Sequence, residues 1–252
     1  MFSVNMRAER IGEERLIPQS GLATIVDYVT TQNVTVTFKN TGYTFKTSYS
    51  NFKHSNLVNR LLPTVYGFGI IGYEDVSVDG ILLKSYKVWK SMVMRCYCEK
   101  KKGWERYKEV VVSEGFRNYK DFKEWYHNQI GHDQEGWHLD KDILSKGCKI
   151  YSEDTCCFVP PDINSVVCDQ TTRKKNGLPV GVSKVGDMFH VRCRLNTKHS
   201  KHIGTYDSVE QAFLVYKRTK EDHIESLANK WKDQIDPRVY EALMNWTISV
   251  GD

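Results

Sequence analysis

Apolar and polar residues alternate at the period of a half-buried strand along the first third of the chain. The alternating segments are Ala23–Val29, Val34–Phe38 and Tyr43–Tyr49. A Lys39-Asn-Thr-Gly turn signal separates the last two segments, and three glycines between residues 67 and 72 mark a tight return. We therefore predict a small twisted β-barrel over residues 1–83.

From residue 84 the apolar positions recur at helical spacing instead. Trp89, Met92 and Cys96 share one face of a helix predicted over residues 85–97. A second stripe is typical of a buried helix face rather than of a platform that stacks nucleic-acid bases. Its members are Phe116, Tyr119, Phe122 and Trp125.

The segment Trp137–Val166 predicts a short strand, an irregular loop, a second short strand and a helix opened by two prolines. Its polar side chains include Asp140, Lys141, Asp142 and Asn164. A carboxylate on the first strand and a carboxamide on the following helix can converge on one hard cation.

Two or three strands followed by an amphipathic helix are predicted after residue 176. Alternation along the central strand turns Val191, Cys193 and Leu195 toward the helix. The outward positions are then His190, Arg192 and Arg194. The last predicted element is a short helix capped by Asp236 and started by Pro237.

These elements predict a multidomain α+β fold. Its parts are a β-barrel at 1–83, a unit around the candidate cation site at 84–170, a sheet-plus-helix module at 176–232 and a C-terminal helix at 233–252.

The charge of the chain is mild overall but unevenly distributed. The 252 residues carry 36 Lys and Arg against 31 Asp and Glu, which alone does not indicate nucleic-acid binding. Between Arg173 and Tyr206, however, eight basic residues face Asp187 alone, a concentration that suits contact with phosphates. The chain shows neither an apolar run of membrane length nor the apolar core of a signal peptide.

Seven cysteines at irregular spacing are typical of a reducing compartment rather than of a disulfide scaffold. They lack the two paired Cys-x-x-Cys motifs of structural zinc sites, so we expect free thiols and no zinc. The cysteines that lie near one another in the sequence are Cys96 with Cys98, and Cys148 with Cys156 and Cys157.

The strand–loop–strand–helix order of Trp137–Val166, with its Leu-Asp-Lys-Asp-Ile sequence, resembles the ββα-metal unit of phage-type HNH homing endonucleases. Trp89, Met92, Arg95 and Cys96 match the Trp-x-x-Met-x-x-Arg-Cys opening of the same subfamily. The resemblance implies Mg²⁺, or Mn²⁺, held by Asp140 and Asn164. It also implies a Tudor- or KOW-like N-terminal barrel, and a phage-encoded protein in the cytoplasm of a bacterial host.

One position departs from the family pattern. Lys141 stands where the first strand of the family carries the histidine that activates water. An ordinary lysine has a pKa of about 10.4 and is a poor base at neutral pH. Lys141 is therefore expected to bind phosphate instead. His138 lies on the same strand face as Asp140 and is the candidate base, while Asp142 is a candidate alternative ligand.

The segment 176–232 resembles an APETALA-type DNA-binding module. Matching residues are Gly181, Val182, Phe189, Ile203–Tyr206, Glu210, Ala212 and Tyr216. Sheet-reading proteins lay strands in the major groove of double-stranded DNA. The predicted DNA contacts are Lys184, His190, Arg192, Arg194 and Lys201, together with Arg95 in the preceding domain.

The leading hypothesis is a site-recognising, metal-dependent DNA endonuclease, in which cleavage of both strands requires a homodimer or a second event. The missing histidine supports a second hypothesis, a catalytically degenerate DNA-binding protein that acts as a repressor, an architectural factor or an inhibitor of a host protein. A third is an RNA-directed role for the N-terminal barrel, which predicts tighter binding to RNA than to duplex DNA.

Overall fold

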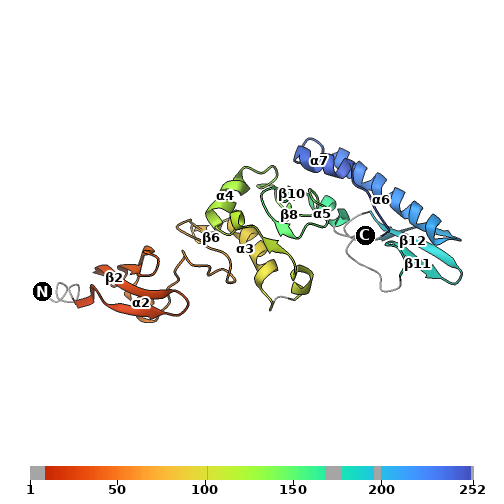
Figure 1. Cartoon of the computed structure of the whole chain (residues 1–252). Coiled ribbons are helices and arrows are strands. Elements are labelled where there is room, and N and C mark those ends of the chain that lie inside the picture. The colour runs from red at the N-terminus through yellow and green to blue at the C-terminus, as the bar shows by residue number, and fades with distance from the viewer. Residues whose placement is uncertain (1–8, 101, 168–176, 196–199, 251–252) are drawn as a thin grey trace. The chain divides into compact units, whose positions relative to one another are not determined.

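The structure is a computed structural model that describes residues 9–100, 102–167, 177–195 and 200–250 (Figure 1). Its contacts divide the chain into two compact units, Met1–Glu124 and Trp125–Asp252. The fold mixes helices with several small sheets, which is compatible with the predicted α+β class. The predicted boundary after residue 83 lies inside the first unit. Within the described ranges, no helix combines the length and apolarity needed to span a membrane.

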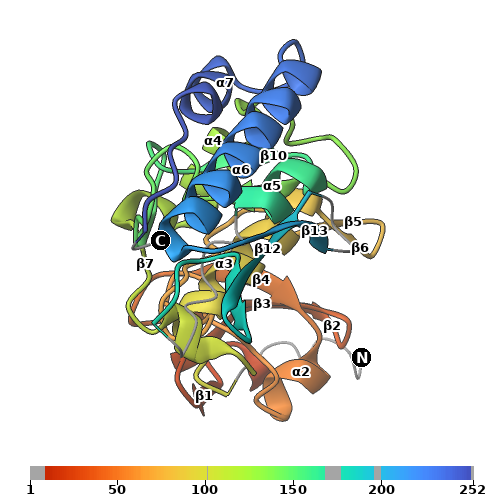
Figure 2. The ribbon, with the colours of Figure 1, turned by 90° about the vertical axis from the view of Figure 1, so that its right-hand side faces the viewer.

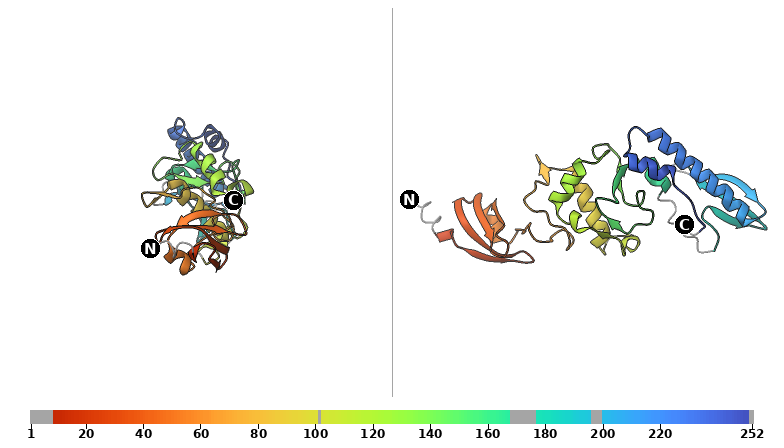
Figure 3. Two further views of the ribbon diagram at one scale, coloured as in Figure 1. Left: turned by 90° about the vertical axis from the view of Figure 1, so that its left-hand side faces the viewer. Right: turned by 45° about the horizontal axis from the view of Figure 1, so that its top comes forward.

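The first unit begins with a four-stranded antiparallel sheet in the order β1-β2-β3-β4, which Figure 3 shows as an open layer. Its strands are β1 (Glu14–Ile17), β2 (Gly21–Thr30), β3 (Asn33–Phe38) and β4 (Thr44–Thr47). Val34, Val36 and Phe38 are fully buried at alternate positions of β3, as the sequence pattern predicts.

The predicted barrel is wrong, because the described part of this sheet does not close. The expected strand Tyr43–Tyr49 stops at Ser48, whose hydroxyl accepts a hydrogen bond from the Asn51 N–H at 3.2 Å. This N-cap starts α2 (Tyr49–Lys53), which buries Phe52 in the core of the sheet. A helical turn therefore covers the core where the sequence pattern predicted more strand.

The rest of the first unit is built on α3. The elements after the sheet are β5 (Ser77–Val78), β6 (Ile81–Leu82), α3 (Lys84–Tyr97), the 3-10 helices η1 (Trp104–Tyr107) and η2 (Glu114–Phe116), β7 (Val111–Val112) and the start of α4 (Tyr119–His127). Trp89, Met92 and Cys96 are buried on one side of α3, which confirms the predicted apolar face. The Trp89 indole donates to the Phe116 carbonyl at 2.8 Å and so ties α3 to the second apolar stripe.

The second unit contains the metal-unit segment and the C-terminal module. Its further elements are β8 (His138–Asp140), β9 (Ile150–Tyr151), β10 (Cys157–Val159), α5 (Pro161–Val167), β11 (Val182–Val185), β12 (Met188–Arg194), β13 (Ser200–Tyr206), α6 (Val209–Trp231) and α7 (Pro237–Met244).

Strands β11, β12 and β13 form an antiparallel sheet with α6 across one face (Figure 2). Val182, Val191 and Cys193 are fully buried and share a hydrophobic core with Ala212 and Tyr216 of α6. The predicted order of strands and helix, and the predicted inward face of the central strand, are confirmed. Because α6 covers one face, the other face of the sheet carries the outward side chains.

Helix α7 completes this core. The Asp236 carboxylate accepts a hydrogen bond from the Arg238 N–H at 2.8 Å, and Pro237 occupies the first helical position, as predicted. Val239 and Leu243 then pack into the same core as α5 and α6.

The described cysteines are free thiols that differ in burial. Cys98 and Cys148 are partly exposed, whereas Cys156, Cys157 and Cys193 are buried. Burial raises the pKa of Cys156 to about 12 and raises the pKa of Cys157 well above its ordinary value. These buried sulfurs are therefore protonated at neutral pH.

Candidate functional site

The first candidate site is formed by β8, β10 and α5. Strands β8 and β10 pair antiparallel, with Asp140 opposite Cys157 and His138 opposite Val159. Two-residue alternation places His138 and Asp140 on the same face of β8. Helix α5 follows β10 directly, and its Asn164 amide meets the His138 ring with 2.9 Å between Nδ2 and Nδ1. The structure thus brings together two of the predicted site residues.

Asp140 has a structural task in the turn after β8. Its side chain is buried, and Oδ1 accepts the main-chain N–H groups of Asp142 at 2.8 Å and Ile143 at 2.9 Å. Burial raises the pKa of the Asp140 carboxyl, while the two N–H donors act in the opposite direction. The carboxylate therefore fixes the start of the loop that connects the two strands.

Lys141 is bound into the same loop. It is only 8% exposed, and Nζ donates to Asp142 Oδ1 at 2.6 Å and to the Cys148 carbonyl at 2.5 Å. The ammonium also lies 5.9 Å from the centre of the Tyr151 ring. In this conformation the lysine supports the loop, and a phosphate contact would require Nζ to exchange one of these partners.

The donor types at this site fit a hard cation. Carboxylate and carboxamide oxygens, here on Asp140 and Asn164, are the ligands that Mg²⁺ prefers. The His138 ring beside Asn164 adds an imidazole, the side chain that most often serves as a general acid or base. Among the described residues there is no cluster of three or more His, Cys, Asp or Glu side chains that could hold a metal ion.

The second candidate site is the face of the C-terminal sheet that α6 leaves uncovered. On the central strand, Arg192 and Arg194 are exposed and His190 is half-buried, while Val191 and Cys193 between them are fully buried. His202 of β13 pairs with Arg192, and its ring lies 5.5 Å from that of His190. The outward positions predicted from alternation are confirmed. We call these four side chains, His190, Arg192, Arg194 and His202, the basic sheet face.

Two predicted contacts, Lys184 and Lys201, lie in other rows of the sheet. Lys184 pairs with Phe189, and Lys201 pairs with Cys193. Paired residues share a face of the sheet, so the side chains of both lysines leave the backbone on the face that α6 covers. A bulge turns Lys201 to this side, because Val191 pairs with Gly204 whereas the next residue, Arg192, pairs with His202. The added residue in β13 reverses which of its side chains face α6. Both lysines are exposed at the rim. Their contact with DNA stays a prediction.

Arg95, the predicted contact in the first unit, is half-buried, and its Nε donates to the Ser91 carbonyl of the same helix at 3.3 Å. The exposed basic residues of α3 are instead Lys84, Lys87 and Lys90. Their spacing of three residues is visible in the sequence and marks one side of the helix. The sequence of α3 contains no acidic residue, so this side is uniformly basic.

Comparisons of the chain with family models, curated proteins and solved structures find no match. The assignment of function therefore depends on the residues and geometry described above.

Proposed function

We propose that the chain binds double-stranded DNA through the basic sheet face. The observation that supports this proposal is the exposure of Arg192 and Arg194 at alternate positions of the central strand, on the side opposite α6. Alternate residues of a strand are about 6.8 Å apart. Successive bases along a DNA strand are about 3.4 Å apart, so the two arginine positions on the strand match base pairs two steps apart.

The chemistry of this face suits the major groove. Arginine reads the O6 and N7 acceptors of guanine with two hydrogen bonds, and histidine or serine side chains can contact bases or phosphates. The outward rows of the described strands contain no acidic side chain that would repel the phosphates. Their members are Ser183, Val185, Met188, His190, Arg192, Arg194, Ser200, His202 and Thr205.

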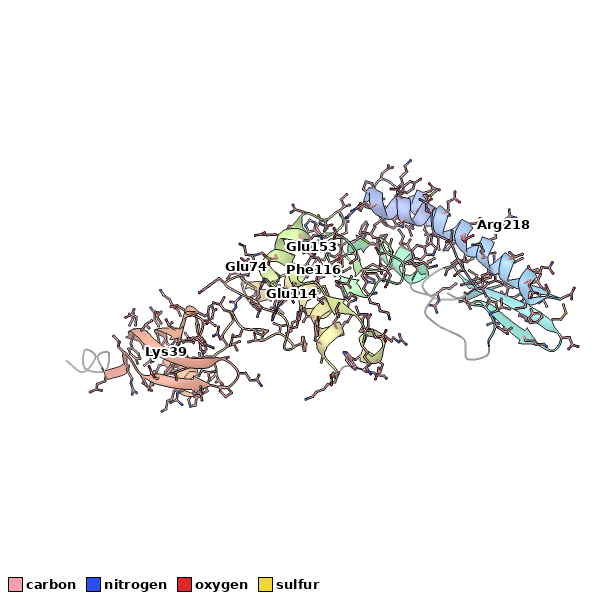
Figure 4. The ribbon with its side chains drawn as sticks, in the orientation of Figure 1. Lys39, Glu74, Glu114, Phe116, Glu153 and Arg218 are labelled. Atoms are coloured by element: carbon pink, nitrogen blue, oxygen red, sulfur yellow. The ribbon has the colours of Figure 1, made fainter. Side chains whose placement is uncertain are left out.

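The test is DNA binding by Arg192→Ala and Arg194→Ala, measured by fluorescence anisotropy on duplexes selected from a random pool by the wild-type chain. Each substitution is expected to weaken binding about tenfold and to relax base preference at one position, because each removes one arginine–base contact. The control is Arg218→Ala, since Arg218 is 86% exposed and extends from the solvent side of α6 (Figure 4).

Variants of Arg192 and Arg194 that bind as tightly as the Arg218 variant would contradict the proposal. Selection of single-stranded RNA over duplex DNA would do so as well. A loss that is equal for all sequences would assign these arginines to phosphates rather than to bases.

A second candidate function is metal-dependent hydrolysis of a DNA phosphodiester, and the contact between His138 and Asn164 favours it. Asp140 and Asn164 would hold Mg²⁺, which supplies charge stabilisation for the phosphate under attack. In the contact as it stands, the Asn164 amide N–H donates to His138 Nδ1. For His138 to act as base through Nε2, the Asn164 amide must turn by about 180° so that Nδ1 carries the proton and donates to the amide oxygen.

Cleavage is tested by nicking of supercoiled DNA with Mg²⁺ or Mn²⁺. His138→Ala is expected to lower the rate at least about 100-fold, on the order of the effect of removing a general base, and Asn164→Ala should lower it because a metal ligand is lost. Asp154→Ala, which removes an exposed acid from the same loop, is the control and should cleave normally. Intact DNA binding without any Mg²⁺-dependent product from the wild-type chain would leave the DNA-binding function alone.

A further inference from the structure

A lysine interrupts the apolar face of α6. The buried positions of this helix recur about every four residues and are Ala212, Phe213, Tyr216, Lys220, Ile224 and Ala228. Lys220 has no exposed surface, although the spacing of its neighbours predicts an apolar side chain there. Lysine is almost never fully buried without polar partners, since taking its charge out of water is costly. A buried Lys220 ammonium is therefore expected to donate to polar groups inside the module.

Lys220 reaches the end of the central strand of the basic sheet face. Its Nζ donates to the main-chain carbonyl of Arg194, the last residue of β12, at 3.2 Å. His223, three residues further along the same helix, forms a hydrogen bond with the backbone of Leu195. Two side chains of α6 thus hold two consecutive residues of the main chain. We call this pair, Lys220 and His223, the β12 clamp.

The clamp acts on the residue whose side chain enters the proposed DNA interface. The carbonyl held by Lys220 and the guanidinium that faces outward both belong to Arg194. The direction of a side chain follows from the backbone torsions of its own residue, so fixing the carbonyl limits where the guanidinium can lie. A bidentate contact with a base tolerates little displacement.

We propose that the β12 clamp positions Arg194 for the recognition of double-stranded DNA. This inference rests on the proposed DNA-binding function and assigns to Lys220 and His223 a part in it without contact with the DNA.

The experiment compares DNA binding by full-length Lys220→Met and Arg218→Met. Methionine fills similar space without a donor, and the Arg218 variant removes one charge from the exposed side of the same helix. The Lys220 variant is expected to weaken binding about tenfold, the effect of losing one arginine–base contact, whereas the Arg218 variant should change it less than twofold. In an Arg194→Ala background the Lys220 variant should cause no further loss, although its effect on urea unfolding remains.

A folded Lys220 variant with the affinity of the Arg218 variant would overturn the inference. So would a tenfold loss that persists in the Arg194→Ala background, because the lysine would then act on the whole module. If Lys220→Met does not fold, His223→Ala is tested instead, alone and in the Arg194→Ala background. A His223→Ala chain that binds DNA as tightly as the wild type would equally overturn the inference. A wild-type chain that does not bind DNA would refute the proposed function itself.

Discussion

Gly181→Ala is expected to unfold the C-terminal module, with a loss of about 4 kcal/mol or more in the free energy of unfolding. Gly181 has a φ of +77°, and a Cβ atom there would lie 2.1 Å from Cδ2 of the buried Tyr216 ring. A left-handed alanine costs about 1–2 kcal/mol, and moving the ring out of a packed core adds a larger penalty. Urea unfolding followed by circular dichroism measures the effect.

Gly186→Ala provides the matched control for this prediction. Gly186 has a φ of +61°, but a Cβ atom there would have no neighbour within 4 Å. The Gly186→Ala variant is therefore expected to lose only the backbone penalty, about 1–2 kcal/mol. If both alanine variants lost the same stability, close packing of the backbone against Tyr216 would not be the reason for glycine at position 181.

Asp140→Ala is expected to destabilise the second unit by about 3 kcal/mol, because two main-chain N–H groups lose their acceptor and one of them belongs to the buried Ile143. Asp140→Asn keeps an oxygen at the same place and should stay within about 1 kcal/mol of the wild type. Urea unfolding monitored by tryptophan fluorescence checks both values.

The same pair of variants separates the structural role of Asp140 from its proposed chemistry. A stable Asp140→Asn chain that binds DNA but no longer nicks it would support a metal ligand, since the neutral amide is a weaker ligand than the carboxylate. Equal stability of the alanine and asparagine variants would show that the turn does not depend on the Asp140 side chain.

Sequence reasoning succeeded where one local pattern determines the outcome. The inward and outward rows of β12 followed from alternation at Val191 and Arg192. The start of α7 followed from the Asp236 cap and the proline after it. The buried face of α3 followed from helical spacing around Trp89.

Prediction from the sequence failed where a single side chain ends a strand or an added residue shifts the strand register. The Ser48 hydroxyl ends the strand pattern and starts α2, so the predicted barrel stays open in the described residues. The bulge in β13 moves Lys201 out of the row of Arg192, and alternation by itself cannot show where an added residue lies. The role of Lys220 could not be predicted from the sequence for a different reason. Its acceptor is the main-chain carbonyl of Arg194, which comes near the lysine only in the folded module.

The candidate metal site was predicted in part. The sequence places His138, Asp140 and Asn164 on one strand and the following helix, and the structure adds the contact between His138 and Asn164. The sequence gives no sign that Asp140 and Lys141 also hold the loop together. The tertiary hydrogen bond from Lys141 to the Cys148 carbonyl depends on how that loop folds back.

The buried thiols have a consequence for how this protein withstands oxidation. Cys157 and Cys193 lie in the core shared by β10, α5, the C-terminal sheet and its helices, and burial keeps Cys157 in its protonated, unreactive form. Peroxide and electrophiles attack the thiolate, so both sulfurs are shielded while the second unit is folded. Chemical damage there must wait for a transient opening, so its rate depends on how often the unit opens as well as on how much oxidant is present.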